Sequence, residues 1–202
     1  MTGHVILGGF EAVVLAAGAG SRFGGGKLMA PWRGGVLLDA ALAAALAAPV
    51  RRVTVVWGAD AAVAAAASAH AARVGAADRL NLVRAERHAD GLSASLAAGI
   101  AGLAADCAGV FVFLGDMPRI PASVLLPLRE ALASGALAAA PTFGGRRGHP
   151  VLFSAALFED LTRLSGDRGA ASVLDRLGDR LSLISAADNG VLFDVDRPGD
   201  LG

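Results

Sequence analysis

The sequence alternates between short runs of Val, Leu, Phe and Ala and longer Ala- and Leu-rich segments, and this alternation constrains the fold most strongly. The short runs have the length and composition of buried strands, whereas the longer segments have the length of helices. Parallel strands need a crossover connection between them, and that connection is usually a helix. The pattern therefore predicts a three-layer α/β fold, in which helices cover both faces of a mostly parallel, Rossmann-like sheet, within a single domain over residues 1–202.

The expected elements change in character at Pro141. Before it, strands are expected at 12–17, 53–57, 80–84, 110–114 and 137–140, and helices at 40–48, 59–74, 92–103 and 122–134. After it, the glycine-rich turn at 142–148 predicts a β-hairpin excursion whose second strand is 150–153. Helices at 155–164 and 170–177 and strands at 181–184 and 191–195 are expected to complete the chain.

Charge and composition exclude several classes of protein. Lys and Arg number 18, as do Asp and Glu, so no overall field attracts nucleic acid or anionic lipid. Hydrophobic residues make up 54%, but Asp39 and Pro49 interrupt the richest stretch, so no transmembrane helix is expected. Because no basic segment precedes the first apolar run, a cytoplasmic location is expected. The single cysteine, Cys107, is assigned no role.

A loop of small residues follows the first expected strand and contains two cations, Arg22 and Lys27. Glycines let backbone N–H groups approach a phosphate closely, and the cations supply charge, so the loop is typical of a phosphate-binding site. It is not a P-loop, because Ser21 stands where that motif needs glycine and Leu28 stands where it needs Ser or Thr.

The same loop also departs from the dinucleotide-binding fingerprint. Phe23 stands where the third glycine is required, and the second expected strand ends in Trp57 and Gly58 without an acidic residue. A plain glycine-rich connection between a strand and a helix is the alternative, but such a connection does not call for two cations.

Acidic residues in two motifs could bind a divalent cation. Asp116 follows the apolar strand at 110–114, and ligands of an open parallel sheet lie beyond the carboxyl ends of its strands. Mg²⁺ is usually held by one or two carboxylates together with phosphate oxygens, so a second carboxylate is expected. In the extended segment 193–198, Asp194 and Asp196 point to one face, and either could supply it.

Taken together, these residues resemble the MobA-like nucleotidyltransferases, and most closely the molybdenum cofactor cytidylyltransferases. The resemblance spans nearly the whole chain and rests on six segments in family order, 15–27, 91–96, 115–118, 146–153, 166–170 and 194–198. The first and third recur across many nucleotide-sugar and isoprenoid nucleotidyltransferases, whereas the fourth and fifth are narrower and indicate the cofactor branch.

The resemblance implies a fold of the nucleotide-diphospho-sugar transferase type and a Mg²⁺-dependent transfer of CMP from CTP to the molybdenum (molybdopterin) cofactor, with release of pyrophosphate. It implies a nucleotide site made of Leu15, Ala16, Ala17, Gly18, Gly20, Ser21, Arg22, Lys27, Gly91 and Ser95. Lys27 and Arg22 would be catalytic, and Asp116 and Asp196 would hold Mg²⁺. Ala16-Ala17-Gly18 resembles the cytidylyl enzymes, whereas guanylyl relatives usually have Gly-Gly there, which favours CTP over GTP.

The acceptor site is expected at the hairpin, where Arg146, Arg147 and His149 lie close together in the sequence. Such a group would suit the phosphate of an anionic pterin. Solvated arginines at a hairpin tip, with His149 capping a turn before Pro150, are the structural alternative.

Departures from the family pattern leave other functions open. Ala171 stands where relatives often have Arg, Leu92 replaces a common Met, and the segment 32–36 lacks the Lys-Pro pair of many relatives. The alternatives are the same chemistry with GTP or on another phosphorylated acceptor, and a maturation chaperone that hands the cofactor to a client molybdoenzyme.

Overall fold

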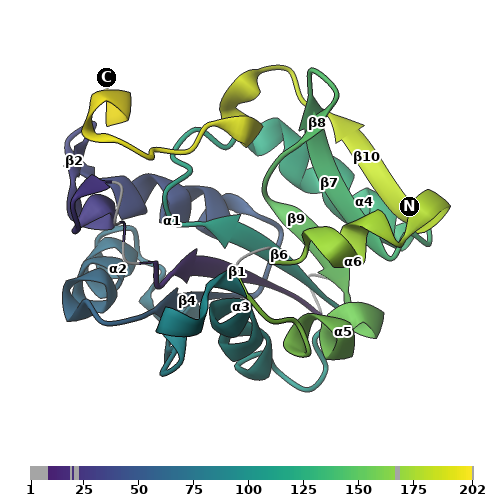
Figure 1. The fold of residues 1–202 in the computed structure, drawn as a ribbon, viewed down its shortest axis with the longest axis horizontal. Coiled ribbons are helices and arrows are strands. Elements are labelled where there is room, and N and C mark those ends of the chain that lie inside the picture. Colours follow the sequence, from purple (N-terminus) through teal and green to yellow (C-terminus); the bar gives the residue numbers. More distant parts are fainter. Residues whose placement is uncertain (1–8, 19, 21–22, 167–168, 202) are drawn as a thin grey trace.

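The structure is a computed structural model that describes residues 9–18, 20, 23–166 and 169–201. Its centre is an eight-stranded sheet with the order β10-β7-β9-β6-β1-β4-β5, in which β8 pairs with β7 beside this path (Figure 1). The strands are β1 (Phe10–Ala16), β4 (Arg52–Trp57), β5 (Leu80–Arg84), β6 (Gly109–Leu114), β7 (Ala138–Phe143), β8 (Arg146–Arg147), β9 (Val151–Ser154) and β10 (Leu181–Ser185). A separate two-stranded ribbon joins β2 (Pro31–Trp32) to β3 (Gly35–Val36).

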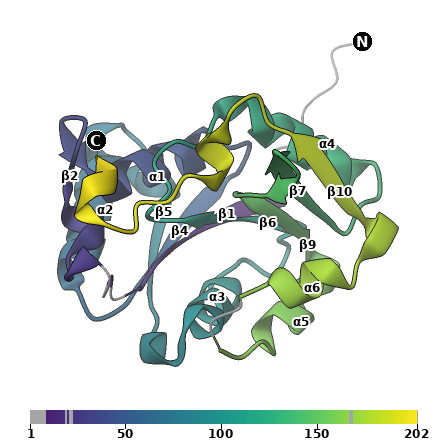
Figure 2. The ribbon, with the colours of Figure 1, turned by 45° about the horizontal axis from the view of Figure 1, so that its top comes forward.

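Helices cover both faces of the sheet, as the turned view in Figure 2 shows. One core lies under α1 (Leu37–Ala47), α2 (Ala61–Arg73) and α4 (Leu125–Ala133), and the other under α3 (Leu92–Ala101), α5 (Phe158–Thr162) and α6 (Ala171–Asp175). Val13 and Val14 of β1 are fully buried in different cores, because successive side chains of a strand point to opposite faces. The predicted α/β fold class is therefore confirmed.

Short 3-10 helices make many of the connections. They are η2 (Lys27–Met29), η3 (Ala77–Arg79), η4 (His88–Asp90), η5 (Ala122–Val124), η6 (Ala155–Leu157), η7 (Gly178–Arg180), η8 (Asn189–Leu192) and η9 (Pro198–Leu201). The helix expected over 155–164 is divided between η6 and α5, and the one expected over 170–177 is shortened to α6. In the part of the chain that the structure describes, no helix has the length and apolar character needed to span a membrane.

The hairpin after β7 closes more tightly than predicted. Gly144 and Gly145 have φ angles of 56° and 75°, the left-handed region that a two-residue hairpin turn uses, and they join β7 to β8. The predicted second strand forms as β9, but it lies inside the main sheet, antiparallel to both β6 and β7. The segment between β8 and β9 is thereby placed beside the end of β6.

The prediction of a strand at 191–195 was wrong. This segment forms η8 and then an extended stretch that belongs to no strand of the described sheet. The Asp188 side chain accepts a hydrogen bond from the Gly190 N–H at 2.7 Å and starts a helical turn instead. The Val191 carbonyl then accepts the His149 N–H at 2.9 Å, which ties the segment to the hairpin loop.

Small residues set the distance between α3 and the sheet. A Cβ atom at Gly99 would lie only 2.7 Å from Cγ1 of Val13, so glycine allows the helix to pack closely on β1. This contact brings the beginning of α3, with Gly91 and Ser95, to the carboxyl end of β1.

Candidate functional site

The site lies where the neighbouring parallel strands β1 and β6 end. Leu15 is paired with Leu114, and the Gly115 N–H donates a hydrogen bond to the Leu15 carbonyl at 2.9 Å. A Cβ atom at Gly115 would lie 3.2 Å from that carbonyl, so glycine suits this close approach. The two segments that leave these strands, one with Lys27 and one with Asp116, therefore start side by side.

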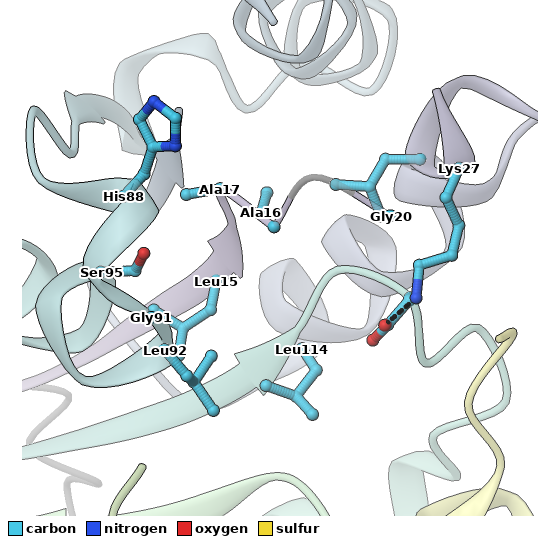
Figure 3. A pocket seen from close by; sticks show the side chains of 13 residues that line it. Leu15, Ala16, Ala17, Gly20, Lys27, His88, Gly91, Leu92, Ser95 and Leu114 are labelled. Atoms are coloured by element: carbon cyan, nitrogen blue, oxygen red, sulfur yellow. Dashed lines mark hydrogen bonds and ion pairs between the residues drawn. The ribbon is translucent and has the colours of Figure 1, made fainter. Parts of the chain in front are cut away.

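The glycine-rich loop folds back on itself and delivers Lys27 to Asp116. Its glycines Gly24, Gly25 and Gly26 have φ angles of 92°, 94° and 62°, which side chains rarely tolerate. The Lys27 ammonium lies 2.6 Å from Oδ2 of Asp116 and 3.7 Å from Oδ1 of Asp196 (Figure 3 draws the first contact). Ser21 and Arg22, which the sequence assigns to this loop, lie outside the described residues.

Backbone hydrogen bonds hold Asp196 next to Asp116. The Val195 N–H donates to the Asp116 carbonyl at 3.0 Å, so the C-terminal segment is attached to the turn after β6. The Asp200 carboxylate accepts the N–H groups of Arg197 at 2.7 Å and of Asp196 at 2.9 Å. These hydrogen bonds hold the pKa of Asp200 below its usual value and fix the backbone on which Asp196 stands.

Asp194, the other carboxylate of this segment, has a different environment. Desolvation of its carboxyl group raises its pKa, and the negative charges of Asp196 and Asp116 add to the effect. Asp196, by contrast, lies within ion-pair distance of Lys27. The structure thus separates two residues that the sequence left equivalent.

The carboxylates of Asp116 and Asp196 fit a hard divalent cation bound together with a substrate. Both already face one cation, the Lys27 ammonium, so a positive charge is favoured at this position. Among the described residues no group of three or more His, Cys, Asp or Glu side chains could hold a metal ion alone. Two carboxylates completed by phosphate oxygens are the usual donor set of Mg²⁺.

A cavity of about 330 Å³ extends from this ion pair along the end of β1 to the beginning of α3 (Figure 3). It is lined by Leu15, Ala16, Ala17, Gly18, Gly20, Lys27, Leu28, His88, Gly91, Leu92, Ser95, Leu114 and Asp116. The sequence assigned ten residues to the nucleotide site, and eight of them lie in the described part of the chain. All eight line this cavity. The phosphate loop and the segment at the start of α3 therefore share one cavity, although more than 60 residues separate them.

Sequence reasoning missed His88, which lines this cavity and also a neighbouring one of about 200 Å³. The second cavity lies between the phosphate loop and the start of α2, where it reaches Gly58 and Asp60. The position of His88 just after β5 could have indicated it, because residues beyond the carboxyl ends of parallel strands face the ligand crevice.

A further cavity of about 230 Å³ adjoins the first and shares Leu15, Leu92 and Leu114 with it. Arg147 and His149 line it, whereas Arg146 is exposed on β8 and does not. Ala171, where relatives often have Arg, also lines this cavity.

The two polar side chains of this cavity are engaged within the protein. The guanidinium group of Arg147 forms an ion pair with Asp175 at the end of α6. Nδ1 of His149 lies 3.4 Å from the Val112 carbonyl oxygen, and burial lowers the pKa of His149 despite the nearby charges of Asp116 and Asp194. The imidazole is therefore neutral near pH 7 and offers hydrogen bonds rather than charge.

Several known proteins are similar to this chain over most of its length. The molybdenum cofactor cytidylyltransferase of Escherichia coli (strain K12) is 25% identical over 195 residues, which cover 96% of this chain and 94% of that protein. The crystal structure of Rv0371c from Mycobacterium tuberculosis H37Rv aligns with a TM-score of 0.78 and 27% identity, over 95% of this chain and 94% of the other. Its complex with manganese aligns with a TM-score of 0.68 and 25% identity, over 88% of each chain.

A nucleotidyl transferase from Methanothermobacter thermautotroptrophicus aligns with a TM-score of 0.74 and 25% identity, over 96% of this chain and 94% of the other. A family model for the MobA-like NTP transferase domain matches residues 12–181, a span that contains the phosphate loop, Asp116 and the hairpin. The chain belongs to the MobA-like NTP transferase family and is a nucleotidyltransferase.

Proposed function

We propose that this nucleotidyltransferase moves CMP from CTP to the molybdenum (molybdopterin) cofactor, with Mg²⁺ as its metal and pyrophosphate as the second product. The observation that carries the proposal is the placing of Lys27, Asp116 and Asp196 at one end of a cavity whose other end is formed by Gly91 and Ser95. The similarity to the molybdenum cofactor cytidylyltransferase of Escherichia coli supports the choice of acceptor and nucleotide.

The nucleotide lies along the cavity with its triphosphate over the glycine-rich loop. Backbone N–H groups of that loop and the Lys27 ammonium offer the donors and the charge that phosphates need. The nucleobase lies at the opposite end, near Leu15, Leu92 and the Ser95 hydroxyl. A cytoplasmic location, where nucleoside triphosphates are supplied, is part of the proposal.

Asp116 and Asp196 hold the divalent cation in this proposal. When bound, Mg²⁺ supplies charge neutralisation and Lewis acidity to the phosphate oxygens. The Lys27 ammonium faces the same two carboxylates in the structure. With the cation on those carboxylates, Lys27 would be available to the phosphates.

In the proposed reaction an oxygen of the acceptor's terminal phosphate attacks the α-phosphorus of CTP in line. The new O–P bond forms as the bond between the α-phosphorus and the bridging oxygen of pyrophosphate breaks. The attacking phosphate is already anionic, so the protein need not supply a general base. Lys27, together with Arg22, stabilises the negative charge that passes to the leaving group, the main task of a phosphoryl-transfer site.

The acceptor enters through the adjoining cavity, whose apolar walls suit a flat ring system. Arg147 can pair with an acceptor phosphate by giving up its ion pair with Asp175, whereas the neutral His149 contributes a hydrogen bond. Arg146, exposed on β8, lies at the rim of the hairpin and can contact only a part of the acceptor that extends from the cavity. A client molybdoenzyme would receive the product.

The proposal is tested by pyrophosphate release with CTP or GTP, Mg²⁺, and either the molybdenum cofactor or other phosphorylated acceptors. We expect turnover with CTP and the cofactor, and its loss in Asp116→Asn, which removes a ligand charge at nearly constant volume while circular dichroism stays unchanged. Turnover only with another acceptor would replace the substrate assignment. Tight CTP and cofactor binding without pyrophosphate release would indicate a cofactor-carrying chaperone.

A further inference from the structure

His88 is the only side chain with a ring among the residues that line the main cavity in the described part of the chain. Figure 3 shows it at the end of the cavity that also holds Ser95 and Gly91, across from Lys27. It is half-buried, and its imidazole has no hydrogen-bond partner among the described residues. A flat polar ring therefore lies at the end of the cavity opposite to Lys27.

The backbone around His88 is held by a series of hydrogen bonds. The Ala85 N–H donates to the Trp57 carbonyl at 2.8 Å, which continues the pairing of β4 and β5 beyond their ends. The His88 N–H in turn donates to the Ala85 carbonyl at 3.1 Å, and the Gly91 N–H reaches the His88 carbonyl at 3.4 Å. The ring is thus attached to the edge of the sheet rather than to a free loop.

The opposite wall leaves room for the ring. A Cβ atom at Gly58 would lie 2.9 Å from Cγ of His88 and 2.8 Å from the Ala17 carbonyl oxygen. Glycine at this position lets the imidazole approach the phosphate loop, and His88 lines both the main cavity and the one that reaches Asp60.

We infer that His88 determines nucleotide recognition by packing the face of its imidazole against the nucleobase. The inference rests on the proposed function, because it takes the Lys27 end of the cavity as the phosphate end. A base stacks on a ring with a gain that corresponds to about a tenfold change in affinity or more. The phosphates, held at the far end by the loop and Lys27, gain nothing from this contact.

The test compares CTP with inorganic tripolyphosphate, which has the charges of the nucleotide but no base, by isothermal titration calorimetry in Mg²⁺ buffer. We expect His88→Ala to weaken CTP binding about tenfold while leaving tripolyphosphate binding within about twofold. His88→Phe, which keeps a flat ring, should retain most of the CTP affinity. Glu86→Ala, at an exposed position of the same segment, is the control that should change neither.

Two outcomes would overturn the inference. Equal weakening of CTP and tripolyphosphate in His88→Ala would show that the residue acts on the phosphates or on the loop. A loss in His88→Phe as large as in His88→Ala would rule out contact through the ring face. The proposed function itself would fail if the unaltered protein bound no nucleoside triphosphate more tightly than it binds tripolyphosphate. That result is distinct from the two outcomes that concern His88.

Discussion

The Lys27 ammonium and the Asp116 carboxylate form a contact of 2.6 Å at one end of the cavity, although they are 89 positions apart in the chain. The side chains are only 13% and 23% exposed, so the pair is largely shielded from solvent. With Asp196 at 3.7 Å, the ammonium faces the carboxylates that we assign to the metal. Lys27 therefore competes with a divalent cation for Asp116 and Asp196 until a phosphate offers it another partner.

This competition gives the first prediction. Lys27→Met should bind Mn²⁺ more tightly than the unaltered protein in the absence of nucleotide, by about tenfold, because a nearby positive charge is removed. The same variant should bind CTP more weakly and turn over slowly. Free Mn²⁺ can be measured by electron paramagnetic resonance during titration. Lys27→Arg, which keeps the charge, is the matched control, and an unchanged Mn²⁺ affinity in Lys27→Met would contradict the idea.

The second prediction separates the two carboxylates of the C-terminal segment. Asp196→Asn should reduce turnover by a factor of about a hundred or more, the size expected when one charge-stabilising group is lost from such a site. Asp194→Asn should retain most of the activity, because Asp194 makes no ion pair with Lys27 among the described contacts. Initial rates of pyrophosphate release at several Mg²⁺ concentrations would show this. Equal losses in both variants would mean that the two residues share the metal.

A third prediction concerns pH. Desolvation, and then the charges of Asp196 and Asp116, raise the folded-state pKa of Asp194 above its usual value of 3.8, so ionising this carboxyl costs more in the folded than in the unfolded chain. A group of this kind destabilises the fold once it ionises, which it does as pH rises through the raised pKa. Asp194→Asn should therefore increase the melting temperature at pH 7.

The increase should shrink as the pH is lowered from 7 toward the raised pKa, below which the carboxyl is protonated and resembles the amide. Melting curves of both proteins across this range test the sign. Asp188→Asn is not a suitable control, because its side chain caps η8. Asp78→Asn, on the distant η3, serves instead and should show no such pH-dependent difference. A gain that stays constant with pH would contradict an electrostatic origin.

Hydrophobic runs and glycine positions made much of the fold predictable. The strands β1, β4 and β6 were predicted because both of their faces are largely buried, which gives mostly apolar runs. The edge strand β5 is more exposed, but its Leu and Val residues still gave a recognisable short run. Asp116 was expected beside the phosphate loop for the same reason, since the carboxyl ends of neighbouring parallel strands meet at one edge. Local sequence was sufficient to predict these elements because their local structural preference agrees with their place in the tertiary structure.

Long-range contacts decided what could not be predicted. The apolar residues from Val191 to Val195 read as a strand, but they pack against the sheet while the backbone of this segment bonds to His149 and Asp116. Neither the insertion of β9 beside β6 nor the ion pair between Arg147 and Asp175 has a local signal. His88 escaped notice because a single histidine beyond the end of a strand belongs to no motif of recognisable spacing.

The last prediction tests the acceptor side, where Arg147 and His149 line a cavity next to the nucleotide site. The double variant Arg147→Ala and His149→Ala should worsen saturation by the molybdenum cofactor about tenfold, because it removes one charge-assisted contact and one hydrogen bond. The affinity for CTP should hold, since neither residue lines the main cavity. Arg146→Ala is the control, because it removes the same charge from an exposed neighbour outside the cavity. Asp175→Asn should act in the opposite direction and tighten cofactor binding, because it frees the Arg147 guanidinium group from its internal partner. Weaker CTP binding with unchanged cofactor saturation would place this cavity on the nucleotide side instead.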